Sequence, residues 1–281
     1  METLAKQAAI VSMAVLGMTF VIVSGGIDLS IGSVVACSSV VVATVLKAQG
    51  ENAAIWAILA GIGTGLAAGL LNGLLITRLK VAPFIVTLGT LLVIRGAAHG
   101  IAREQGVYPD RTWMSGILAG LKPEQKWMIF PPGVWATVIF IILAATVLKY
   151  TAFGRAIRAV GGNETAARYS GLRVDRIKLA AYVLMGLFAG LAGVLMFSRL
   201  SVGDPTSALG LELDVIAAAV IGGASLSGGQ GSIMGSILGA LIMTILRSGL
   251  SQLGLSNWVE QMITGGVIIL AVAVDRLRTS R

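Results

Sequence analysis

A polar segment interrupts two long apolar runs near the beginning of the chain. It reads Ser-Gly-Gly-Ile-Asp-Leu-Ser over residues 24–30. Non-helical backbone at membrane depth is tolerated only where protein buries it or it faces a water-filled cavity, and an ionisable residue there is a functional candidate. Asp28, Ser30 and Ser33 are therefore candidates for a polar translocation path or gate. The same window also fits a turn between two helices, with Asp28 as a cap.

Residues that could form a catalytic or metal site are scarce. His99 is the only histidine and Cys37 the only cysteine, so no intrachain disulfide, zinc site or two-histidine metal site is expected. The string Leu-Ser-Gly-Gly-Gln at 226–230 is the signature of ABC-type ATPase domains, but the chain has no P-loop of the form G-x-x-x-x-G-K-[ST]. We interpret it as a Gly/Ser turn between helices. The chain is therefore not expected to be an enzyme, and no catalytic residue, metal or cofactor is predicted.

The most polar stretch of the chain, residues 149–178, is strongly basic. Short loops rich in Lys and Arg face the cytoplasm in membrane proteins. This stretch carries seven basic residues against Glu164 and Asp175: Lys149, Arg155, Arg158, Arg168, Arg173, Arg176 and Lys178.

A short helix is predicted inside this cytoplasmic loop. Asn163 is a suitable N-cap, Glu164 follows in the first turn, and Gly171 can end the helix as a left-handed residue. About two turns of helix are marginal alone in water, so we expect the helix to dock on the membrane domain or on a partner. A simple solvated basic loop is the alternative.

Composition places the remainder of the chain in a membrane. Of 281 residues, 56% are hydrophobic and 12% are charged, with a mean hydropathy of +0.89. A soluble domain carries about 25% charged residues. We predict an all-α, polytopic integral membrane helical bundle of about nine to ten transmembrane helices. Nine apolar segments qualify as spans: 8–24, 31–46, 53–77, 81–98, 133–148, 179–197, 211–224, 231–249 and 259–274.

The distribution of charge predicts the orientation of the bundle. The basic C-terminal tail and the turn at Arg78 and Lys80 belong on the cytoplasmic side, whereas loop 99–132 is nearly balanced in charge and fits the outside. The segment 211–224 is short and could be a broken or a re-entrant helix. Because both 149–178 and the tail are inside, the number of crossings between them must be even, so this segment counts as a crossing. The net charge of +8 then reflects membrane orientation, with lipid rather than nucleic acid as the partner.

A second glycine-rich segment resembles the first one. Residues 25–32 and 222–229 share the pattern Gly-Gly-x-x-Leu-Ser-x-Gly. Transporters often contain internal repeats, but five shared positions of common residue types are weak evidence. The predicted topology gives both copies the same orientation, so no inverted repeat is expected.

Three separated motifs resemble those of permease subunits of ribose-type sugar ABC importers. They lie at 17–33, at 160–171 (Val-Gly-Gly-Asn-Glu-Thr-Ala-Ala, then Ser-Gly) and at 211–223. The resemblance covers almost the whole chain. It implies a single transmembrane permease domain over 1–281 in the bacterial inner (plasma) membrane, paired with a second permease copy or a paralogue. Two cytoplasmic ABC ATPase subunits would power it, and an external (periplasmic) sugar-binding protein would dock near 99–132 and 198–212.

The resemblance also bears on the N-terminus and leaves two alternative functions. Family members carry a further apolar span before the equivalent of residue 8, so an N-terminal helix is expected to be lacking here. Two alternatives remain open: a branched-chain amino acid ABC permease of similar architecture, and an ion-coupled secondary transporter.

The resemblance implies a coupling helix to the ATPase within 153–172, with these candidate residues: Gly154, Gly161, Gly162, Asn163, Glu164, Ala167 and Gly171.

Overall fold

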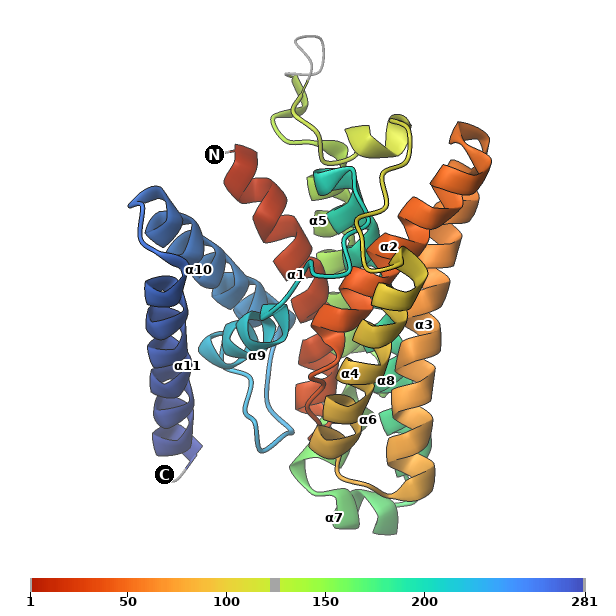
Figure 1. Ribbon diagram of the computed structural model, residues 1–281. Helices are drawn as coiled ribbons and strands as arrows, with labels where there is room; N and C mark the ends of the chain where they lie inside the picture. The colour runs from red at the N-terminus through yellow and green to blue at the C-terminus, as the bar shows by residue number, and fades with distance from the viewer. Residues whose placement is uncertain (1, 122–126, 280–281) are drawn as a thin grey trace.

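The computed structural model describes residues 2–121 and 127–279, and its regular structure in these ranges is helical (Figure 1). Within these ranges seven helices are long and apolar enough to cross a membrane. The polytopic helical fold predicted from the sequence is confirmed. The seven are α1 (Glu2–Val23), α2 (Ile31–Gln49), α3 (Ala54–Leu79, preceded by the 3₁₀ turn η1, Glu51–Ala53), α4 (Pro83–Ala102), α5 (Pro132–Tyr150), α8 (Val174–Leu200) and α10 (Ile233–Gln252).

The remaining two predicted spans differ from the seven long helices. The last helix, α11 (Asn257–Thr279), has an apolar part of only 258–273. The segment expected to cross at 211–224 contains α9 (Leu211–Ile221), whose 11 residues rise about 16 Å, roughly half of an apolar bilayer core. One helix at this position is therefore too short to span a bilayer, as the shortness of the segment had suggested. The chain instead continues from α9 through a non-helical segment to α10, and α9 lies across the direction of the long helices in Figure 1.

Helix α1 is the centre of the bundle. Nearly all of its side chains beyond Gln7 are buried, and it packs against α5, α8, α9 and α10. By contrast, α4 and α5 present large apolar side chains outward, such as Leu92 and Ile142. In a membrane protein such outward faces meet lipid or another apolar helix, because the surrounding hydrocarbon is as apolar as they are.

The tightest helix pair, α3 with α8, packs through small residues. Gly65 and Gly69 on α3 lie against Gly186 and Gly190 on α8, and a β-carbon at any of these four positions would collide with the opposite backbone. Such spacing of small residues lets two membrane helices approach closely enough for backbone contact. The high glycine content of the chain, 37 residues, is partly explained by interfaces of this kind.

The bundle has two distinct ends. One end, called here the α7 end, carries α6 (Ala152–Gly162), α7 (Glu164–Tyr169) and the turn between α3 and α4. The opposite end carries the N-terminus, η1 and the connection between α4 and α5 with the 3₁₀ turn η2 (Trp113–Gly116). The predicted cytoplasmic loops at 80 and 149–178 thus share one end. The predicted external loop 99–132 lies at the other end, except that its residues 122–126 are outside the described residues.

Candidate functional site

The α7 end is built around a hairpin of two helices, of which the first was missed in the sequence. The side chain of Thr151 caps α6 by accepting a hydrogen bond from Gly154 N at 3.2 Å. Ile157 and Val160 are buried on one face of α6. The signal was present: a threonine cap, followed by Ile157 and Val160 three residues apart, with Arg155 before them and Arg158 between them.

Helix α7 has the two ends that were predicted for it. The side chain of Asn163 accepts a hydrogen bond from Ala166 N at 2.9 Å, which is the N-cap, and Gly171 is left-handed with φ +84°. Ala167 is buried in a small apolar cluster with Val160 and Val174. Tyr169, the last residue of the helix, is 89% exposed. The capping prediction is confirmed, and the coupling role of these residues stays a prediction.

Charged side chains orient α7 on the start of α8. Glu164 pairs with Lys178 at 2.5 Å and with Arg168 at 3.3 Å, and Arg168 also pairs with Asp175 at 3.3 Å. The hydrogen bond from Lys178, together with the charges of Lys178 and Arg168, holds the pKa of the Glu164 carboxyl below its ordinary value. The network ties the short helix to the start of a long membrane helix.

Glycines from three distant segments meet where α6 ends. Gly161 lies against the carbonyl of Val23, the last residue of α1, and that carbonyl accepts a hydrogen bond from Gly229 N at 2.9 Å. Gly228 approaches both Gly161 and Gly25. We call this set (Val23, Gly25, Gly161, Gly228 and Gly229) the glycine junction. It joins the hairpin of α6 and α7 to the two glycine-rich segments that share a sequence pattern, so both breaks in the helices touch α6 directly.

The three polar candidates for a path form a closed hydrogen-bonded turn. Asp28 Oδ1 accepts hydrogen bonds from Ser30 N at 2.8 Å and from Ser30 Oγ at 2.6 Å. Asn72 on α3 donates to Ser30 Oγ at 2.9 Å, and Ser33 Oγ donates to the Ser30 carbonyl at 2.7 Å. All four residues are buried. The arrangement holds the entrance to α2 in place, and a role for Asp28, Ser30 and Ser33 as gate residues stays a prediction.

Taken together, these features define a class of protein. The chain is a membrane domain of packed apolar helices with a capped, charged hairpin at one end, and the described residues contain no cluster of His, Cys, Asp and Glu that could hold a metal ion. This combination defines a polytopic α-helical integral membrane protein.

The comparisons with known proteins place this domain in a permease family. A family model described as branched-chain amino acid transport system / permease component matches residues 1–272, and the chain belongs to this family. It is 41% identical to the ribose import permease protein RbsC of Bacillus subtilis, over 99% of this chain and 84% of that protein. It is 39% identical to RbsC of Escherichia coli K12 (96% and 83%) and 34% identical to the L-arabinose transport system permease protein AraH of that strain (99% and 83%). No solved structure matches the chain significantly.

Proposed function

We propose that the chain is the transmembrane permease subunit of an ATP-driven ABC importer of monosaccharides. The observation that carries the proposal is the capped α7, held on α8 by ion pairs and presenting Tyr169 outward at one end of the bundle. The similarity to ribose and arabinose permeases supports sugar as the substrate class. The printed description of the family supports a second candidate, a branched-chain amino acid.

In this proposal the energy comes from other chains. Separate ATPase subunits would contact α6 and α7 in the cytoplasm, the C-terminus would lie on the same side, and a second permease copy or a paralogue would complete the path. An external binding protein would deliver the sugar at the opposite end. Motion of α7 would reach α8 through Glu164 and Lys178, and motion of α6 would reach α1 and the segment before α10 through the glycine junction.

The test is reconstitution with the missing partners. We would assemble the chain in proteoliposomes with the ATPase subunit and binding protein of a ribose importer, and measure ATP hydrolysis with and without ribose. We expect ribose-loaded binding protein to stimulate hydrolysis several-fold. Replacing the exposed Tyr169 by Ala should reduce this stimulation. Stimulation by a leucine-loaded binding protein alone would instead establish the second candidate.

A further inference from the structure

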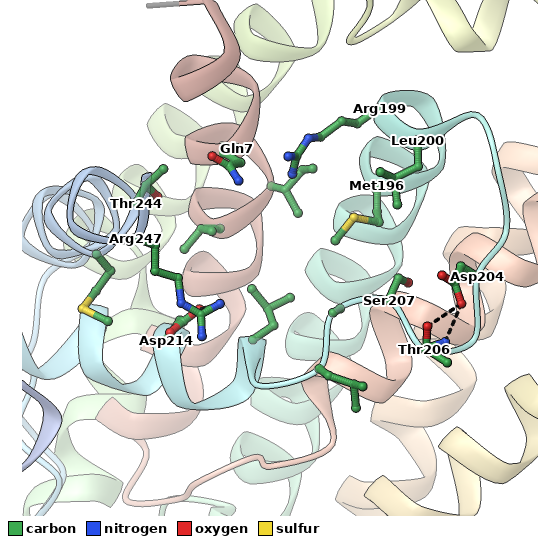
Figure 2. A pocket seen from close by; sticks show the side chains of 16 residues that line it. Gln7, Met196, Arg199, Leu200, Asp204, Thr206, Ser207, Asp214, Thr244 and Arg247 are labelled. Atoms are coloured by element: carbon green, nitrogen blue, oxygen red, sulfur yellow. Dashed lines mark hydrogen bonds and ion pairs between the residues drawn. The ribbon is translucent and has the colours of Figure 1, made fainter. Parts of the chain in front are cut away.

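A polar cavity of about 360 Å³ lies toward the opposite end from α7, between α1, α8, α9 and α10 (Figure 2). Its volume is at the small end of the range of ligand pockets, which is roughly 300–1,000 Å³. The segment 204–211 forms one wall, and Figure 2 shows Gln7 from α1 and Arg199 from α8 at another. None of Asp28, Ser30 and Ser33 lines it.

The lining contains polar groups whose hydrogen-bonding capacity is unused. Asp214 is only 3% exposed, and its Oδ2 pairs with Arg247 Nη1 at 2.8 Å, while its Oδ1 has no partner among the described residues. The hydroxyl of Ser207 is also buried without a partner in the described part of the chain. Buried polar groups without a partner are uncommon in proteins, because each costs the desolvation of a group that water would otherwise satisfy.

The cavity wall is fixed rather than loose. The guanidinium of Arg95 on α4 donates hydrogen bonds to the carbonyls of Pro205 and Ser207, both at 2.7 Å. Asp204 accepts hydrogen bonds from Thr206 N and Thr206 Oγ1 at 2.8 and 2.7 Å, so the wall forms a tight turn. The unpaired hydroxyl of Ser207 is therefore held in a defined position.

The chemistry of this lining suits a neutral polyhydroxyl ligand. A free carboxylate oxygen on Asp214 accepts from hydroxyl groups, Gln7 and Ser207 both donate and accept, and Ile10 and Met243 supply apolar walls. The lining also holds Arg199 and Asp204, which form no salt bridge among the described residues, and their side chains can donate hydrogen bonds to hydroxyl groups and accept hydrogen bonds from them. We propose that this cavity is a monosaccharide-binding site on the translocation route, an inference that rests on the proposed function.

The decisive variants remove hydroxyl groups without disturbing the fold. Ser207→Ala deletes a hydroxyl that has no partner among the described residues, so the substitution removes no hydrogen bond found in that part of the chain. Thr244→Val deletes a second one, which lines the cavity and donates to the Ala240 carbonyl at 2.7 Å. Thr146→Val is the matched control, since Thr146 makes the same kind of bond, to Ile142, on the exposed face of α5.

The experiment compares uptake of radiolabelled D-ribose with ATPase stimulation in the complete reconstituted transporter. We expect Ser207→Ala and Thr244→Val each to lower the maximal uptake rate about fivefold, the factor that loss of one hydrogen bond gives, with stimulation by loaded binding protein retained. Thr146→Val should leave both unchanged. Ribose should also slow alkylation of Ser207→Cys in a Cys37→Ala background.

The outcomes separate this proposal from the one it rests on. If the unmodified transporter takes up ribose but both hydroxyl variants do so at the same rate, and ribose gives Ser207→Cys no protection, the cavity is not a sugar site and the importer function stands. If the unmodified transporter moves L-leucine and not ribose, the proposed function itself is wrong, and the cavity proposal falls with it.

Discussion

Gly161 and Gly162 are neighbours in the chain, yet a methyl group would meet different surroundings at the two positions. At Gly161 it would collide with the Val23 carbonyl and come within 2.6 Å of Gly229 N, the two groups that hydrogen-bond across the glycine junction. At Gly162 it would meet nothing within 4 Å. We therefore expect Gly161→Ala to destabilise the protein by about 1–3 kcal/mol, as overpacking does.

The adjacent variant Gly162→Ala is the control for that prediction. It should leave stability unchanged or raise it by up to about 1 kcal/mol, because alanine is the better helix former. Apparent melting temperatures in detergent and ribose-stimulated ATP hydrolysis provide the readouts. Equal behaviour of the two variants in both measurements would show that the glycine junction is not a tight contact.

The carboxyl of Glu164 makes the attachment of α7 dependent on pH. Its pKa in the folded protein lies below the ordinary value of 4.5, mainly because Lys178 donates a hydrogen bond to it. A lowered folded-state pKa means that the stabilisation is fully present above the unfolded value and is lost as pH falls through the folded value. Glu164→Gln should therefore speed hydrogen exchange in α7 at pH 7.

The size of the Glu164 contribution follows from the exposure of its side chain, and its pH limit follows from the lowered pKa. The Glu164 side chain is 44% exposed, and such ion pairs are worth about 0.2–1 kcal/mol. The difference in exchange between the original protein and Glu164→Gln should vanish once the pH is below the lowered pKa of Glu164. A difference that persists unchanged at that pH would mean that packing, and not the carboxylate, holds α7.

At the scale of helices, the α3–α8 pair depends on glycine at particular positions. A β-carbon at Gly65 would collide with the Gly186 carbonyl and lie 2.7 Å from Gly190 Cα, whereas at Gly63 it would meet nothing within 4 Å. Gly65→Ala should push the two helices apart and lower the apparent melting temperature, at a cost of about 1–3 kcal/mol. Gly63→Ala, two residues away on the same helix, should melt at or above the original temperature. A Gly65→Ala protein as stable as Gly63→Ala would contradict the packing.

Local signals predicted those helices whose ends depend on nearby residues. The apolar runs located the long spans, and Asn163 and Gly171 located the ends of α7, because a cap is made by residues within four positions of each other. Charge parity requires only that segment 211–224 cross and does not give its form, which in the structure is a short helix followed by a non-helical segment. The glycine junction could not be predicted, since Val23, Gly161 and Gly229 come together only through the packing of distant helices.

For the whole molecule, the separation of the two ends predicts which residues face each side of the membrane. Tyr169 at the α7 end is 89% exposed, and Tyr108 at the opposite end is 71% exposed. The basic loop 149–178 should hold the α7 end in the cytoplasm, because moving its charges across the bilayer is costly. A membrane-impermeant thiol reagent should therefore label Tyr108→Cys in intact spheroplasts and Tyr169→Cys only in inside-out vesicles.

Labelling can distinguish the sides cleanly because of the single native thiol. Cys37 is 4% exposed within α2, so the unmodified protein should react little from either side, and Cys37→Ala removes that background altogether. Reaction of Tyr169→Cys in intact spheroplasts would place the charged hairpin outside, where no ATPase could reach it, and the coupling role of α6 and α7 would have to be abandoned. Labelling of the two positions from opposite sides would instead show that the cavity lies toward the side from which a binding protein delivers its sugar. The glycine junction would then lie between that cavity and the ATPase subunits proposed to contact α6 and α7.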